Sequence, residues 1–172
     1  MNESFFTIPT QKINLSKLAI EGLTLDIGGG GEGIIGQIKR DKIVIIDQLK
    51  EELEESYANG LKIIMDAQDL KFLDKTFDIS TLFFTMMYIP KQLHKKVFYE
   101  IFRILKDGGE LFLWDVRIPE RKHSKENAFV VPISIRLDNN KIIDTMYGVK
   151  WDKTQNLEYF ISLAKKTNFN II

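Results

Sequence analysis

Short apolar runs rich in β-branched residues alternate with helical patterns over the first two-thirds of this chain. Ile34, Ile35 and Ile38 follow the first run at helical spacing, and a four-residue stripe starting at Leu93 follows the fourth. Parallel strands need crossover helices, so this alternation predicts an α/β fold with a mostly parallel sheet and helices on both faces. The expected strands are residues 23–27, 42–47, 61–65, 77–84 and 110–116.

The last third of the chain has a different pattern. Residues 117–127 are polar and predict a surface loop, and Asp138-Asn139-Asn140 separates two β-prone runs, as in a β-hairpin. Apolar residues recur on one helical face from Leu157 to Ala164, and a final strand is expected after Asn168. We predict one domain over residues 1–172, with a core at 22–116, a loop and hairpin at 117–151, and a C-terminal helix and strand at 154–172.

Charge and cysteine content limit the classes of function. The chain has 24 basic and 24 acidic side chains, so there is no global positive field to attract nucleic acid or anionic lipid. It contains no cysteine, which excludes disulfides and thiolate chemistry and suits a reducing cytoplasm. No apolar run approaches the ~18 residues of a spanning helix. We therefore expect a cytoplasmic protein that binds neither nucleic acid nor membranes.

A glycine-rich turn follows the first expected strand. Gly28, Gly30 and Gly33 have the GxGxxG spacing of nucleotide-binding turns, where missing side chains let a ligand approach the backbone at a helix N-terminus. Asp47 closes the next expected strand at the distance where an acidic side chain binds ribose hydroxyls. The alternative is a strand-to-helix turn without a ligand.

The charges around this turn favour one class of nucleotide cofactor. Asp26 and Glu32 flank the glycines, and a carboxylate would repel the pyrophosphate of a dinucleotide. S-adenosylmethionine (SAM) instead carries an ammonium and a sulfonium, which a carboxylate attracts. The alternatives to a cofactor role are stabilisation of the turn by Asp26 and interaction of Glu32 with the helix dipole. For Glu32 this alternative is favoured.

An ordered series of motifs resembles class I SAM-dependent methyltransferases, of the type 11 kind, over about half the chain. Residues 25–33 (LDIGGGGEG) are similar to the family's first motif, and residues 45–47 (IID) to its second. Residues 65–70 (MDAQDL) with Phe72 resemble the segment that brackets the adenine. Further similarities are Phe77-Asp78 with Met86, Tyr88 and Ile89, and residues 104–109 (ILKDGG), which resemble the family's Leu-Lys-Pro-Gly-Gly turn.

The resemblance implies a three-layer Rossmann-like methyltransferase fold, SAM as cofactor and S-adenosylhomocysteine (SAH) as product. It places Asp26 beneath the amine of SAM, Asp47 at the ribose, and Asp66 at the adenine amino group. It also implies that the backbone amide of Ala67 contacts the ring and that Leu82 lies near the methionine. The complete expected cofactor site is Asp26, Gly28, Gly29, Gly30, Asp47, Gln48, Asp66, Ala67, Gln68 and Phe83.

The sequence also departs from the family pattern. Glu32 is inserted before Gly33, and Asp107 replaces the usual proline. The chain ends at Ile172, which leaves no residues for the family's antiparallel seventh strand. Either the hairpin supplies substitute antiparallel strands, or an open sheet edge is covered by a partner chain, as in a homodimer.

No side chain is identified as catalytic, because methyl transfer from a sulfonium depends mainly on orientation and a dry site. Candidates at strand ends are Tyr88, His94, Asp115 and Arg117. We expect His94 and His123 to be solvated surface residues, and no metal site. The leading function is methyl transfer to a small-molecule acceptor. The alternatives are a non-catalytic SAM-binding domain that acts through a partner and a NAD(P)-dependent oxidoreductase, against which Asp26 argues.

Overall fold

The computed structural model describes residues 4–121 and 125–172, and the chain forms two compact units. One unit comprises Ile20–Asp115 and Phe160–Ile172. The other comprises Met1–Ala19 and Val116–Tyr159. The expectation that the whole chain is a single domain stays a prediction.

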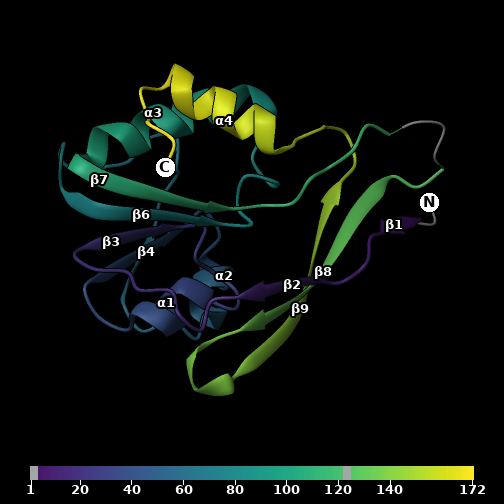
Figure 1. Cartoon of the computed structure of the whole chain (residues 1–172), viewed down its shortest axis with the longest axis horizontal. Coiled ribbons are helices and arrows are strands. Elements are labelled where there is room, and N and C mark those ends of the chain that lie inside the picture. Colours follow the sequence, from purple (N-terminus) through teal and green to yellow (C-terminus); the bar gives the residue numbers. More distant parts are fainter. Residues whose placement is uncertain (1–3, 122–124) are drawn as a thin grey trace. The chain divides into compact units, whose positions relative to one another are not determined.

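The first unit contains a five-stranded sheet in which every neighbouring pair of strands is parallel. Its strand order is β5-β4-β3-β6-β7 (Figure 1). All four residues of β3 are buried, as expected for the central strand of a parallel sheet covered on both faces. The predicted α/β fold is therefore confirmed. The strands are β3 (Thr24–Ile27), β4 (Ile43–Asp47), β5 (Leu61–Ile64), β6 (Phe77–Phe83) and β7 (Leu105–Trp114).

Helices cover both faces of this sheet. The connections from β3 through β5 move toward one edge, whereas the connection from β6 to β7 moves toward the other. Right-handed crossovers in opposite directions place their helices on opposite faces, so α1 and α2 lie on one face and α3 on the other (Figure 1). The helices are α1 (Ile34–Lys39), α2 (Lys50–Glu55), the short 3₁₀ turn η1 (Lys91–Leu93) and α3 (His94–Ile104).

Helix α3 ends at Ile104, and the backbone is already extended at Leu105. Strand β7 therefore begins before the strand expected at residues 110–116. The register between β6 and β7 shifts between Phe77 and Ile79, so residues 106–109 form an irregularity inside the strand. Gly108 has a φ of 78° there, a conformation that glycine adopts without strain.

The C-terminal segment is a helix followed by coil. Helix α4 (Leu157–Lys166) confirms the predicted helix, but the strand expected after Asn168 is wrong. Asn168 takes a left-handed φ of 69°, and the Phe169 amide donates to the carbonyl of Ala164, which together terminate α4. The ring of Phe169 then packs edge-on against Phe98 and Phe102 of α3 instead of joining a sheet.

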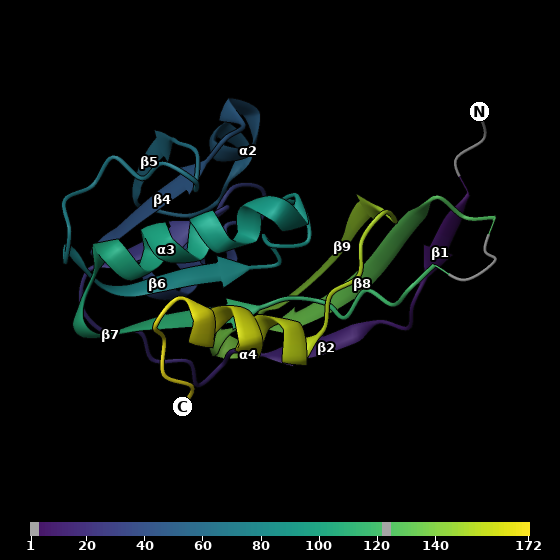
Figure 2. The ribbon, with the colours of Figure 1, turned by 90° about the horizontal axis from the view of Figure 1, so that it is seen from above.

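The second unit contains a separate four-stranded sheet (Figure 2). Its centre is the predicted hairpin, in which β8 pairs antiparallel with β9, and Asn140 in the connecting turn has a φ of 59°. Two strands that the sequence analysis missed, β1 and β2, pair in parallel with β8. The strands are β1 (Phe5–Thr7), β2 (Gln11–Asn14), β8 (Ala128–Arg136) and β9 (Ile142–Lys150), and the 3₁₀ turn η2 (Asp138–Asn140) connects the last two.

This pairing corrects one expectation about the hairpin. It does not supply substitute antiparallel strands to the five-stranded sheet, because β8 and β9 pair only with each other and with β1 and β2 in the part of the chain that the structure describes. Phe6, Phe129 and Trp151 form an aromatic cluster within the second unit, and Phe129 is completely buried. Among the described helices, none has the length and apolar character that a membrane crossing requires.

Candidate cofactor site

The carboxyl ends of four parallel strands bring the predicted site residues to one edge of the sheet. Ile27 pairs with Ile46 of β4 and with Leu82 of β6, and Asp47 pairs with Ile64 of β5. Chain connections leave β3 and β6 in opposite directions, so the topological switch point lies between these two strands. Ligands of open α/β sheets bind in the crevice outside the carboxyl ends at that point.

The glycine turn at the end of β3 is held by the neighbouring strand and by α2. The amides of Gly28 and Gly29 both donate to the Ile46 carbonyl, at 2.8 and 3.2 Å, and the Gly31 amide donates to the Glu52 carbonyl at 2.9 Å. Gly28 and Gly31 have φ values of 69° and 56°, which disfavour any side chain. The turn therefore requires glycine for its own backbone conformation.

The missing side chains also make room for neighbouring protein atoms. A Cβ on Gly29 would meet the carboxylate of Asp26, and a Cβ on Gly30 would lie 2.5 Å from the Cβ of Glu52 and 2.9 Å from Oδ2 of Asp47. Three carboxylates thus surround the turn at close range. That these glycines also contact a cofactor stays a prediction.

Asp26 is buried beneath the turn. Its carboxylate is 1% exposed and accepts a 2.6 Å hydrogen bond from the hydroxyl of Thr81. Burial raises the pKa of Asp26 to about 7, an effect that the Thr81 hydrogen bond opposes and the charge of Asp47 reinforces. Asp26 therefore exchanges its proton near neutral pH.

Further negative charge lies along the turn. Asp47 is half-buried, and its Oδ1 accepts the Leu49 amide at 3.0 Å. Desolvation raises the pKa of Glu52, and the charges of Asp47, Glu55 and Glu32 raise it further. A cation would relieve this repulsion, whereas a diphosphate would increase it. The residues present therefore fit a positively charged cofactor such as SAM.

The predicted adenine-binding residues form a compact turn after β5. The Asp66 carboxylate accepts the backbone amide of Gln68 at 2.9 Å, and the side-chain amide of Gln68 contacts both carboxylate oxygens at 3.2 Å. Asp66 is exposed and Ala67 is buried. Gln68 therefore bonds to Asp66 in this structure, and its contact with the cofactor stays a prediction.

Two further predicted residues have different surroundings. Gln48 is exposed directly after Asp47. Phe83 is 8% exposed and lies in an aromatic cluster with Phe84 and Trp114, at ring separations of 5.1 and 5.8 Å. These contacts give Phe83 a place in the core, and its predicted contact with the cofactor is a proposal.

The catalytic candidates have different surroundings in the structure. Tyr88 is exposed, and Asp115 accepts the Met87 amide at 3.1 Å. The expectation that His94 is a solvated surface residue is wrong: its side chain is completely buried, Nε2 lies 2.9 Å from the Ile89 carbonyl, and the ring stacks against Phe160. Arg117 is exposed in the other unit, and His123 lies outside the described residues.

Sequence reasoning missed three residues at this edge. Thr81 bonds Asp26, and the Thr85 hydroxyl donates to the Ile27 carbonyl at 2.8 Å, next to the space that a side chain on Gly28 would need. Glu52 lies against Gly30 and Gly31. Only the strand register and the helix packing identify them. Within the described residues, no group of three His, Asp or Glu side chains could hold a metal ion.

Comparison with known proteins agrees with this geometry. A family model described as a methyltransferase domain matches residues 25–113. The chain therefore belongs to this family of class I SAM-dependent methyltransferases, and SAM is its cofactor. This assignment favours the methyltransferase over the NAD(P)-dependent oxidoreductase.

One curated relative and two solved structures illustrate the similarity. The chain is 32% identical over 114 residues to a sterol 4-C-methyltransferase from Caenorhabditis elegans, covering 63% of this chain and 31% of that protein. A SAM-dependent methyltransferase from Methanosarcina mazei is similar with a TM-score of 0.60 at 19% identity, over 87% of this chain and 80% of that one. One from Mesorhizobium loti has a TM-score of 0.55 at 13% identity, over 88% and 75% of the two chains.

These similarities differ in what they show. The two solved structures share the fold. The chain spans about a third of the length of the curated relative that it matches.

Proposed function

We propose that this protein transfers the methyl group of SAM to a small-molecule acceptor. The observation that carries the proposal is the group of carboxylates around the glycine turn, where the pKa values of Asp26 and Glu52 are both raised. SAM supplies a methyl group on a positively charged sulfur when it is bound. The protein supplies negative charge at the place where that cation is expected.

The proposed cofactor contacts follow the strand ends. Asp26 lies beneath the amine, Asp47 binds the ribose hydroxyls, and Asp66 accepts the adenine amino group. Gly28, Gly29 and Gly30 line the methionine part, and Gln48, Ala67, Gln68 and Phe83 complete the site. Since the carbon is already activated, orientation and exclusion of water provide the catalysis, with no side-chain nucleophile.

The proposal of a small acceptor has two supports. The curated relative is named as a sterol methyltransferase, and the balanced charge of the chain offers no global attraction to nucleic acid. Sterols and other small apolar molecules are therefore the first acceptors to test.

Calorimetric titration with SAM, SAH and NADH tests the cofactor. We expect SAM and SAH to bind and NADH not to bind. Asp47→Asn should weaken SAM binding by about tenfold or more, the value of a hydrogen bond to a charged group. Asp41→Asn is the matched control, because Asp41 is exposed at the opposite end of β4. Unchanged affinity of the Asp47 variant would overturn the site assignment.

Incubation with SAM labelled in its methyl group tests turnover. A panel of sterols and other small metabolites is offered, and label in the extracted acceptor is the expected result. SAM binding without transfer to any acceptor, including a source-cell extract, would indicate a non-catalytic SAM-binding domain. Label found mainly in RNA or protein would contradict the small-molecule acceptor.

A further inference from the structure

The loop that carries Asp66 has no helix of its own. Residues 65–76, here called the β5–β6 loop, connect two parallel strands entirely through turns and coil. Two of its side chains anchor it to the core: Leu70 is 2% exposed, and Phe72 packs edge-on against Phe77 at 5.0 Å. Such anchors hold the loop near the sheet but do not fix the direction of its peptide groups.

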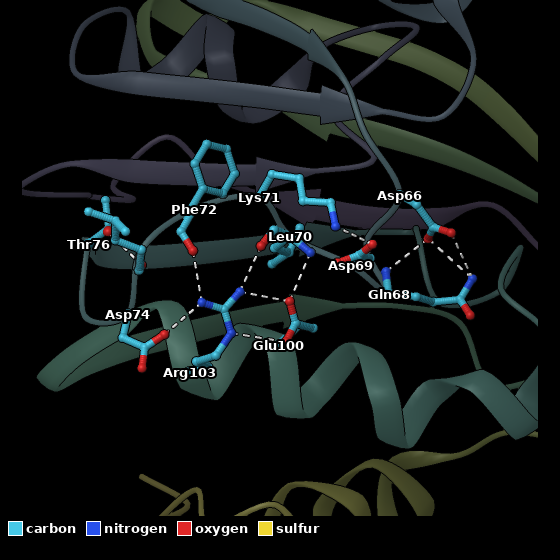
Figure 3. A network of polar contacts seen from close by, with 11 residues as sticks. Asp66, Gln68, Asp69, Leu70, Lys71, Phe72, Asp74, Thr76, Glu100 and Arg103 are labelled. Atoms are coloured by element: carbon cyan, nitrogen blue, oxygen red, sulfur yellow. Dashed lines mark hydrogen bonds and ion pairs between the residues drawn. The ribbon is translucent and has the colours of Figure 1, made fainter.

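Arg103 of α3 fixes the orientation of these peptide groups. Nη2 donates to the Leu70 carbonyl at 2.7 Å, and Nη1 donates to the Phe72 carbonyl and to Oδ1 of Asp74, both at 2.8 Å (Figure 3). Nε and Nη2 also donate to the two carboxylate oxygens of Glu100, at 3.0 and 2.8 Å. These bonds use all five N–H donors of the guanidinium, and three of them hold the loop.

Glu100 completes the contact from the same helix. Its Oε2 accepts the Leu70 amide at 2.8 Å, so the N–H and the C=O of Leu70 are both bound to side chains of α3. The Arg103 hydrogen bonds lower the pKa of Glu100, and they raise the pKa of Arg103. The side chains of Arg103 and Glu100 are 31% and 21% exposed, respectively, so this bidentate pair is better protected from water than an exposed ion pair.

The clamped residue lies next to the turn that carries Asp66. The Asp69 amide donates to the Asp66 carbonyl at 3.1 Å, and the Asp66 carboxylate binds the Gln68 amide, so residues 66–69 form one hydrogen-bonded unit. Leu70 follows this unit directly. Helix α3 therefore holds the C-terminal side of the turn that carries the Asp66 carboxylate, while the Met65 amide, bound to the Asp47 carbonyl, holds the other side.

We propose that Arg103 and Glu100 are positioning residues for adenine recognition, which set the selectivity of the site by clamping the β5–β6 loop to α3. The proposal rests on the proposed function, in which Asp66 accepts the adenine amino group. It predicts that loss of the clamp reduces the preference for adenine and does not only reduce stability. The guanidinium fork is required, because a lysine ammonium cannot reach two carbonyls and two carboxylates in one plane.

The test compares the binding of SAH with that of S-inosylhomocysteine, which lacks the adenine amino group. We expect the wild-type protein to prefer SAH by about tenfold or more, as for a hydrogen bond to a carboxylate. Arg103→Lys and Glu100→Gln should reduce this preference below about threefold, because both weaken the bidentate contact between the guanidinium and the carboxylate. Both variants keep much of the local packing. Glu100→Gln also keeps an oxygen for the Leu70 amide.

Lys106→Ala is the matched control. It removes an ion pair with Asp78 that lies outside the β5–β6 loop, and it should leave the preference within about twofold of wild type. Thermal unfolding of every variant is measured beside the binding. Clamp variants that lose stability but keep the tenfold preference would show a purely structural role and overturn the proposal.

Binding measurements on the wild-type protein distinguish failure of the proposed function from failure of the clamp proposal. If it binds neither SAH nor SAM, the proposed function fails and the clamp proposal fails with it. If it binds both SAH and the inosyl analogue equally, SAM binding stands, but recognition of the amino group by this loop is overturned.

Discussion

The hydroxyl of Thr81 donates a 2.6 Å hydrogen bond to the carboxylate of Asp26, directly across the pairing of β6 with β3. Both side chains are buried, at 0% and 1% exposure. Burial nevertheless raises the pKa of Asp26 to about 7, because one hydroxyl replaces only part of the lost hydration. An acidic group that titrates near neutral pH therefore lies against the glycine turn.

Replacing Asp26 by asparagine should stabilise the protein in a pH-dependent way. Between the ordinary pKa of 3.8 and the folded pKa of about 7, the folded chain keeps a proton that the unfolded chain has lost. Stability of the wild type therefore falls as pH rises through this window and stays low above it. Urea unfolding at about pH 5 and about pH 8 should show Asp26→Asn gaining roughly 1 to 4 kcal/mol more at the higher pH. A gain that is equal at both pH values would contradict a neutral Asp26 in the folded protein.

SAM binding should become tighter as pH rises through about 7. A cation near Asp26 favours the ionised carboxylate, so below the pKa of about 7 binding must release up to one proton. Calorimetry in two buffers with different ionisation enthalpies counts this proton. The Asp26→Asn variant is the control and should bind SAM more weakly with a flat pH profile. Proton uptake by the wild type would be inconsistent with the proposed place of Asp26 beneath the amine.

Gly29→Ala should destabilise the protein strongly. The new methyl group would collide with the Asp26 carboxylate and lie 2.8 Å from Cγ2 of Ile45, and neither group has free space to move into. Overpacking of this kind costs about 1 to 3 kcal/mol. Gly148→Ala is the control, because its methyl group would lie an ordinary 3.6 Å from Val130. Chemical unfolding measures both, and equal stabilities would show that the turn is less tightly packed than described.

Thr81→Val should weaken the protein more at high pH than at low pH. The change keeps the shape of the side chain but removes the donor to Asp26. A hydrogen bond to a charged group contributes about 1.5 to 3 kcal/mol and a neutral one about 1 kcal/mol, so the loss should grow as Asp26 ionises. Ser80→Ala removes a neighbouring buried hydroxyl whose bond to the Leu25 carbonyl is long, at 3.4 Å, and should have a small, pH-independent effect. Equal pH dependence in both variants would argue against the Thr81–Asp26 pair as its source.

Elements with dense local patterns were predicted correctly from the sequence. Strand β4 has consecutive β-branched residues, and α3 has a continuous apolar stripe, so each is specified by its own residues. Strand β2 was missed because its residues are mostly polar and exposed, and it forms only by pairing with β8 from far along the chain. The strand expected after Asn168 was wrong for a related reason, since Phe169 finds a better contact on α3.

The candidate site was predictable only in part. Asp26 lies one residue before the end of β3, Asp47 closes β4 and Asp66 follows β5, so their place at one sheet edge follows from parallel topology. Thr81 lies in a strand where any small residue would satisfy the pattern, and only the register with Asp26 reveals its role. His94 was expected to be a solvated surface residue, whereas its ring stacks on Phe160 of a distant segment. Contacts of this kind depend on tertiary packing, which the local periodicity of the sequence does not predict.

The sheet of the second unit joins segments that lie far apart in the sequence, and this affects how the protein assembles. Strands β1 and β2 leave the ribosome early, but their partner β8 is complete only after Arg136 has been added. Pairings of such long sequence separation form slowly, and unpaired strands are prone to associate with other chains in the interval. The five-stranded sheet, whose strands all lie between Thr24 and Trp114, can form first, so we expect Phe5 of β1 and Ile13 of β2 to stay without their strand partner until β8 has been made.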